Sequence, residues 1–231
     1  MLEKNISENY KSYYTKKKIG KLFPTEFIVR SFLGNYKNLK KLDQGKIINK
    51  KVLDLGCGDG RNIPFLNYLG FSVYGLEINE EIINFCRNSL KYNDIDVNLA
   101  VGRNSSIPFT DNFFDCIIAC HSCYYVEKQE SFVDNIKEIS RVLKKGGRFV
   151  FSVPKSTSYL LNSSEILDDN HALIRKDPLK IRNGSKIKFF ITKEEIISYI
   201  GFYFDSIEIG SCENDWWGNK EFCWTVICYS K

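Results

Sequence analysis

Residues 51–61 read KVLDLGCGDGR, and this stretch decides the fold. Lys51–Leu55 has the apolar character of a buried strand and runs directly into a turn with glycine at every second position. Because glycine has no side chain, such a turn leaves room for a ligand to touch the backbone. In an open parallel sheet, ligands bind in the crevice beyond the carboxyl ends of the strands. The stretch therefore predicts a nucleotide-type binding turn after the first strand.

Downstream of this turn, short apolar runs alternate with segments of helical periodicity. The runs at 71–77, 96–101, 115–120 and 148–153 predict four further strands, the last of which is ended by Pro154. This alternation is typical of parallel strands that are joined by right-handed helical crossovers. It predicts an α/β fold.

Polar residues and glycines mark the ends of the predicted helices. Asn79 is placed to cap the helix after the second strand, and Thr192 with Glu195 predicts a capping box that opens a helix near the C-terminus. Gly146 and Gly147 are expected to stop the helix that precedes the strand ended by proline.

The C-terminal part of the chain predicts a hairpin. Residues 204–209 and 222–229 read as strands joined by a polar turn, which would close the edge of the sheet. We therefore expect a Rossmann-like, doubly wound, mostly parallel seven-stranded sheet with an antiparallel C-terminal hairpin strand.

A chain of 231 residues is long enough for one well-packed α/β domain with appendages. We expect a single domain that consists of four parts. They are an N-terminal helical lid at 1–46, a cofactor-binding core at 47–154, an irregular substrate-cap insert at 155–190, and a C-terminal helix and hairpin at 191–231. The lid and the insert are expected to lie over the ligand end of the sheet.

The composition excludes several classes of protein. Hydrophobic residues make up 43% and charged residues 26%, which are ordinary globular values and favour neither a disordered chain nor a membrane protein. The net charge of +5 is small and dispersed, so no nucleic-acid partner is expected. The stretch MLEKNISENYKSYY has no apolar segment, so we expect no secretory signal and no membrane anchor, and a cytoplasmic protein. Several of the eight cysteines lie in strand-like runs, which favours reduced thiols.

The spacing of the glycines distinguishes between cofactors. The dinucleotide fingerprint needs its third glycine at the position of Arg61, whereas this chain has it at Gly60. A G-x-G-x-G turn preceded by an acidic residue resembles motif I of the class I S-adenosylmethionine-dependent methyltransferases. Residues 102–115, GRNSSIPFTDNFFD, are similar to that family's G-D-x-x-x-L-P-F-x-D-x-x-F-D stretch, and 143–148, LKKGGR, to its L-K-P-G-G-R turn. The resemblance covers about residues 50–154.

The resemblance implies S-adenosylmethionine as cofactor and S-adenosylhomocysteine as product. Glu77 ends the second predicted strand, where its carboxylate can accept hydrogen bonds from both ribose hydroxyls. Asp54 ends a buried strand, where it is expected to hold the turn through backbone hydrogen bonds. Where the family commonly has an acidic residue that meets the adenine amino group, this chain has Arg103, so that contact falls to backbone or to Asn104. The predicted cofactor-binding residues are Asp54, Gly56, Cys57, Gly58, Gly60, Glu77, Ile78 (packed on the adenine by resemblance), Asn104 and Ala119.

Methyl transfer to a hydroxyl or ammonium group also requires the loss of a proton. His121, directly after the fourth strand, is the predicted base, because the unperturbed pKa of histidine is ~6.5. The alternative is a structural histidine that is only hydrogen-bonded at the end of the strand. Tyr13, Tyr14, Tyr124 and Tyr125 could line the methyl-transfer site, with packing as the alternative. Of these, Tyr13, Tyr14 and Tyr124 are the predicted substrate-binding residues. Cys120 and Cys123 form a C-x-x-C pair, but no second pair accompanies it, so no metal is predicted.

Several groups elsewhere would suit an anionic acceptor such as a carboxylate or phosphate, with charged surface loops as the simpler explanation. They are His171, Arg175 and Arg182 in the insert, and Trp216 and Trp217 in the terminal turn.

The predicted function is transfer of a methyl group to an O or N atom of a small metabolite. The [DN]-P-P-[YF] motif of nucleic-acid amino-methyltransferases is absent, because residues 119–122 read ACHS. The alternatives are a non-catalytic S-adenosylmethionine-binding module or partner subunit and a protein or quinone methyltransferase, with methylation of a metalloid as a weaker option. Neither the acceptor nor the oligomeric state follows from the sequence.

Overall fold

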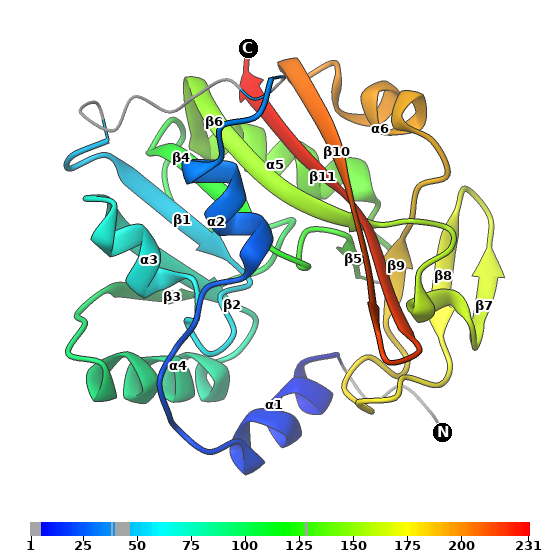
Figure 1. Cartoon of the computed structure of the whole chain (residues 1–231), viewed down its shortest axis with the longest axis horizontal. Coiled ribbons are helices and arrows are strands. Elements are labelled where there is room, and N and C mark those ends of the chain that lie inside the picture. Colours follow the sequence, from blue (N-terminus) through cyan, green and yellow to red (C-terminus); the bar gives the residue numbers. More distant parts are fainter. Residues whose placement is uncertain (1–5, 38, 40–46, 128) are drawn as a thin grey trace.

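The computed structural model describes residues 6–37, 39, 47–127 and 129–231 (Figure 1). The expected N-terminal helical lid therefore lies partly outside the described residues, and its described part contains α1 (Ile6–Lys16) and α2 (Glu26–Leu33). Among the described residues, no helix has the length and apolar character needed to cross a bilayer.

The main sheet has the predicted architecture. Its order is β10-β11-β6-β4-β1-β2-β3, with β1, β2, β3, β4 and β6 parallel and β11 antiparallel to both of its neighbours. The strands are β1 (Lys51–Leu55), β2 (Ser72–Glu77), β3 (Asn98–Val101), β4 (Phe114–Ala119), β6 (Leu143–Pro154), β10 (Phe204–Trp216) and β11 (Asn219–Ser230).

Helices cover both faces of this sheet. Alternate residues of each strand point to opposite faces and contribute to two separate hydrophobic cores. Val52 packs with α2, α3 (Ile63–Tyr68) and α4 (Glu80–Tyr92), whereas its neighbour Leu53 packs in the cluster that contains α5 (Phe132–Val142) and α6 (Lys193–Ile200). Successive strand residues point to opposite faces, which explains the unbroken apolar runs in the sequence.

The helix starts follow the expected chemistry more closely than the helix ends. The Asn79 side chain accepts a hydrogen bond from Ile82 N at 2.9 Å, which confirms the predicted cap. Thr192 Oγ1 accepts from Glu195 N at 3.2 Å, but the Glu195 carboxylate accepts from Ile191 N, so only half of the predicted capping box forms.

The prediction that Gly146 and Gly147 stop a helix is wrong. Helix α5 ends at Val142, and β6 begins at the next residue. The physical reason is pairing: Leu143 already lies opposite Phe114 of β4, so the glycines belong to an irregular start of the strand.

The prediction of an irregular insert is also wrong. Three strands of the insert and one earlier strand, β5, form a second, antiparallel sheet in the order β5-β9-β8-β7. Its strands are β5 (Tyr125–Val126), β9 (Lys186–Lys188), β8 (His171–Ile174) and β7 (Ser164–Leu167), and a short 3₁₀ helix (Tyr159–Leu161) precedes them. These strands are too short for their alternation to stand out in a polar sequence, yet one face is buried in the same cluster as α5.

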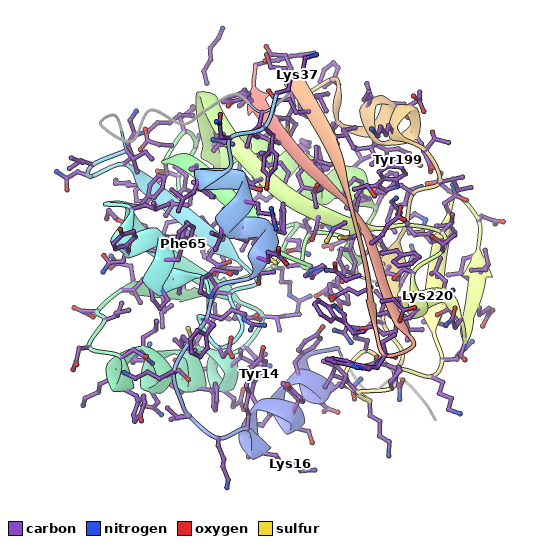
Figure 2. All side chains as sticks on the ribbon, viewed as in Figure 1. Tyr14, Lys16, Lys37, Phe65, Tyr199 and Lys220 are labelled. Atoms are coloured by element: carbon purple, nitrogen blue, oxygen red, sulfur yellow. The ribbon has the colours of Figure 1, made fainter. Side chains whose placement is uncertain are left out.

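A buried lysine joins the second sheet to α6. Lys188 is fully buried and donates to the Tyr199 hydroxyl at 2.9 Å, and its Nζ lies 3.4 Å from a Glu195 oxygen. Tyr199 projects from α6 toward this sheet (Figure 2). The charged bonds hold the insert beside the main domain, because a buried cation is stable only when it is paired.

The C-terminal hairpin is longer than predicted. Its turn is Trp217–Gly218, with φ angles of 49° and 93°, which suits the tight turns of twisted hairpins. Strand β11 pairs with β6 only over Cys223–Tyr229, so the rest of the hairpin extends past the main sheet toward the insert (Figure 1).

One stabilising feature of α5 is directly testable. The Ser131 side chain and Asp134 form a complete capping box. Ser131→Ala should lower the free energy of unfolding by about 1 kcal/mol, measured by urea denaturation, because one helix amide loses its partner. Lys137→Ala, an exposed change within the same helix, is the control, and an equal effect of both substitutions would contradict the role of the cap.

Candidate active site

A cavity of about 340 Å³ lies beyond the carboxyl ends of β1, β2 and β4. The residues after each of these strands line it, together with residues of α1, β5 and the insert. Figure 1 shows α1 across this end of the sheet, between α4 and the insert. The cavity therefore combines the N-terminal helix, the strand ends and the insert at the position where α/β folds bind ligands.

The structure brings most of the predicted site residues to this cavity. Those that line it are Gly56, Cys57, Gly58, Glu77, Ile78, Asn104, His121, Tyr13 and Tyr14. Asp54, Gly60, Ala119 and Tyr124 do not line it.

The glycine turn is shaped by packing within the protein. Gly56, Gly58 and Gly60 all have positive φ, a conformation that side chains disfavour. A Cβ atom at Gly56 would collide with Ser122, one at Gly58 with the Tyr14 hydroxyl, and one at Gly60 would press on Cys86. Glycine is therefore required here by the protein's own packing, while Gly56 and Gly58 still line the cavity with their backbone.

Glu77 connects the end of β2 to this turn. One carboxylate oxygen accepts from Gly58 N at 2.9 Å, and the other accepts from Ile78 N at 2.9 Å. Burial raises the pKa of Glu77, and the two backbone bonds oppose that shift. Each carboxylate oxygen can accept a second hydrogen bond, so Glu77 can still receive a pair of hydroxyl donors from the cavity.

Asp54 lies at the base of the turn and does not have the predicted backbone bonds. The residue is 1% exposed, and neither of its carboxylate oxygens has a hydrogen-bond partner among the described residues. Burial raises the pKa of Asp54 to about 8, and the charges of Glu77 and Asp59 add to the shift. A buried carboxylate without a partner is costly, so the raised pKa keeps Asp54 protonated near neutral pH.

The side of the cavity next to Ile78 is enclosed by residues 102–105. The Asn104 side-chain amide donates to Ser122 O at 3.0 Å and to Tyr125 O at 3.3 Å, so its carbonyl oxygen is the free group. Arg103 pairs with Glu127. The arginine that departs from the family pattern is thus held in an ion pair at the rim of the cavity.

His121 occupies a strained position at the end of β4. Its φ is 55°, in the left-handed region, and such strain in a non-glycine residue is concentrated at functional sites. Ser152 Oγ accepts from His121 N at 3.0 Å and lies 3.3 Å from Nδ1, while Nε2 lies 3.7 Å from a Glu221 oxygen. Burial lowers the pKa of His121, the Glu221 charge opposes this, and Arg182 and Arg61 reinforce it. The ring is therefore neutral near pH 7 and can accept a proton.

The tyrosine predictions are partly wrong. Tyr13 and Tyr14 reach the cavity from α1, and Figure 2 shows Tyr14 projecting toward the body of the molecule while Lys16 points away. Tyr124 lies in the core, 2% exposed, and it is Tyr125 that lines the cavity. The two rings are adjacent in sequence and stacked 4.7 Å apart, and sequence reasoning had no signal to distinguish them.

Sequence reasoning also missed Tyr10 and gave Arg182 only a minor place. Tyr10 lines the cavity from α1, and Arg182 reaches it from the loop between β8 and β9. The other groups suggested for an anion do not line the cavity. His171 is buried in the insert, Arg175 pairs with Glu165, and Trp217 is 94% exposed at the hairpin turn.

The C-x-x-C pair has the character of buried thiols. All eight cysteines are free, and burial raises the pKa of Cys120 to about 12 and that of Cys123 further. Within the described ranges, no group of three or more histidine, cysteine, aspartate or glutamate residues is placed to hold a metal ion.

Comparisons with known proteins identify the domain that carries this cavity. A family model described as a methyltransferase domain matches residues 53–151. A fatty-acid O-methyltransferase of Mycolicibacterium smegmatis is 30% identical over 111 residues, which are 47% of this chain and 39% of that protein. An uncharacterized protein of Methanocaldococcus jannaschii is 27% identical over 83% of this chain and 73% of its own length.

Among solved structures, a protein of Pyrococcus horikoshii is similar in fold. Its TM-score is 0.61 at 22% identity, and the alignment covers 90% of this chain and all of that one. The chain spans about two fifths of the length of the Mycolicibacterium relative, so the similarity to that protein concerns only the core of the fold. The sheet order, the turn after β1 and the match over residues 53–151 together show that the chain carries a methyltransferase domain of the class I S-adenosylmethionine-dependent family.

Proposed function

We propose that the protein is an enzyme that transfers a methyl group from S-adenosylmethionine to an O or N atom of a small metabolite. The observation that carries this proposal is one continuous cavity that reaches both the Glu77 carboxylate and the His121 ring. A cofactor end and an acceptor end that share one cavity allow an in-line transfer without exposure to bulk water.

The residues at the cofactor end fit S-adenosylmethionine. Glu77 has acceptor capacity for two ribose hydroxyls. Ile78 offers an apolar surface to the adenine. The Tyr14 hydroxyl lies against Gly58, so the ligand must sit beside it or displace it.

When bound, S-adenosylmethionine supplies a methyl group on a positively charged sulfur. In the transfer, the acceptor O or N atom would take this methyl group as its bond to sulfur breaks, and S-adenosylhomocysteine would be the product. In the tautomer that carries its proton on Nδ1, His121 donates to Ser152 Oγ, and the Nε2 lone pair is then available to take the acceptor's proton. The carboxylate of Glu221, near Nε2, then stabilises the charged ring.

The relative named fatty-acid O-methyltransferase supports transfer to oxygen, and a nitrogen acceptor fits the proposed base equally well. A small acceptor is favoured because α1 and the insert both line the cavity. We infer a cytoplasmic enzyme without nucleic-acid or membrane partners, which agrees with the free cysteines and the dispersed charge.

Glu77→Gln should weaken the binding of S-adenosylhomocysteine. Charged hydrogen bonds of this kind contribute about 1–3 kcal/mol, so the dissociation constant measured by calorimetry should rise about 5- to 150-fold. Glu80→Gln, an exposed change at the start of α4, should leave it unchanged. Unaltered affinity in the Glu77 variant would remove this residue from the site.

Asp54→Asn should change how stability depends on pH. The pKa of Asp54 is about 8 in the folded protein and ~3.9 when unfolded, so the folded state holds an extra proton between these values. Stability that is present below about pH 4 is therefore lost progressively up to about pH 8 in the wild type, and the Asn variant avoids this loss. In urea denaturation, the free energy of unfolding of the variant should rise relative to that of the wild type as the pH is raised from about 4 to about 8. A constant difference between them would contradict the raised pKa.

His121→Asn should lower turnover without changing cofactor affinity. The acceptor is first identified from a pool of small O and N nucleophiles with methyl-labelled S-adenosylmethionine. Loss of a base should reduce kcat about 10²- to 10⁴-fold. Because the pKa of His121 is lowered, wild-type activity should decline only as the pH falls below ~6.5, and the variant should lack that decline.

An unchanged rate and pH profile would exclude His121 as the base. Binding of the cofactor with no transfer to any acceptor would instead favour a non-catalytic binding module.

A further inference from the structure

We propose that Arg182 binds a carboxylate of the acceptor, so that the enzyme selects small molecules that carry this group. The inference rests on the proposed function, since it assigns the far end of the same cavity. It depends on how Arg182 is held, on the hydroxyls beside it, and on the distribution of charge along the cavity.

Two hydrogen bonds hold the Arg182 guanidinium group in place and leave part of its donor capacity available. Its side chain is 17% exposed, and Nη1 donates to Asp177 Oδ1 at 3.1 Å while Nε donates to the Tyr125 hydroxyl at 3.2 Å. Nη2 has no hydrogen-bond partner among the residues that the structure describes, and Arg182 lines the cavity. A guanidinium group with one free nitrogen beside a cavity is suited to bind a carboxylate oxygen.

Asp177 shapes the loop that presents Arg182. Its Oδ2 accepts from the backbone nitrogen of Ile181 at 3.0 Å and of Arg182 at 3.1 Å, and its side chain is fully buried. Most of its hydrogen-bonding capacity is therefore used within the loop. The aspartate orients the arginine from behind, and the cavity side of the guanidinium is left for a ligand.

Two tyrosine hydroxyls lie beside the guanidinium group. The Tyr10 hydroxyl donates to the Tyr125 hydroxyl at 2.7 Å, and Tyr125 also accepts from Arg182 Nε. Burial raises the pKa of Tyr10, so it remains a neutral donor. A hydroxyl hydrogen rotates toward the nearest acceptor, so this pair can complete the coordination of a carboxylate held by Nη2.

Glu77 and Arg182 place opposite charges at different points of the cavity wall. The charge of Arg182 acts on His121 and helps to lower the pKa of its ring. This arrangement agrees with an anionic group of the acceptor held on the His121 side and a cationic donor beside Glu77.

The apolar neighbours of Arg182 favour a carboxylate over a phosphate. Leu179 and Ile181 line the cavity from the same loop. Phosphate sites usually gather several basic side chains or backbone amides, whereas this end offers one free guanidinium nitrogen and hydroxyls. A carboxylate on a small, partly apolar body matches this lining.

The experiment measures binding of matched probes to the protein loaded with S-adenosylhomocysteine. Calorimetry compares hexanoate with hexanamide and benzoate with benzamide, and phenyl phosphate is a third kind of probe. The acids should bind at least tenfold more tightly than their amides, and Arg182→Gln should reduce this preference to less than twofold. Arg175→Gln, which removes a surface arginine of the same insert paired with Glu165, should leave the preference intact.

Two further variants guard against a loss of structure. Tyr125→Phe keeps the ring and removes the hydroxyl, and Arg182→Lys keeps the charge without the planar fork. Both should show a reduced but measurable preference for the acids, with melting temperatures near that of the wild type.

The outcomes separate this inference from the proposed function. Failure of S-adenosylhomocysteine to bind would overturn the proposed function. Normal binding of S-adenosylhomocysteine with no preference for acids, or a preference that survives Arg182→Gln in a folded protein, would overturn the carboxylate site alone. Tighter binding of phenyl phosphate than of either acid would show that the site takes a different anion.

Discussion

The backbone connection between the glycine turn and the end of β2 is the constraint on which the site depends. Gly56 N and Cys57 N both donate to Leu76 O, and Gly58 N donates to the Glu77 carboxylate. These bonds join the carboxyl ends of β1 and β2, so the positions of the turn and of Glu77 are fixed relative to each other. The positive φ angles of the glycines make this close joining possible. The position of the carboxylate is thus a property of the sheet.

The rest of the cavity is added to this platform by segments that are distant in sequence. Ser122 donates to Leu55 O and so joins the residues after β4 to the end of β1. Strand β5 follows directly and serves as the edge of the second sheet, which brings the insert and Arg182 to the same place. The order of the strands in the main sheet therefore determines which loops meet, and the loops supply the chemistry.

The regular part of this arrangement was predictable from the sequence, and its irregular part was not. Strand β1 has the predicted bounds, and Glu77 and His121 were found because strand ends in a parallel sheet have defined positions. Tyr124 and Tyr125 could not be distinguished, because the choice depends on which ring the second sheet covers. That sheet was itself missed, since strands such as Lys186–Lys188 are too short to show a period. The collision of Tyr14 with any side chain at Gly58 is a contact between distant segments that no local pattern reports.

Helix α1 has contacts with both halves of the cavity. Near its start, Asn9 donates to Asn183 O at 2.7 Å and Tyr10 to Tyr125, whereas Lys17, just after its end, pairs with Asp59 at 2.5 Å. One short helix is therefore tied to both sides of the cavity, to the insert at its start and to the glycine turn at its end. Its length sets the spacing between the loop that carries Arg182 and the turn that contacts Glu77.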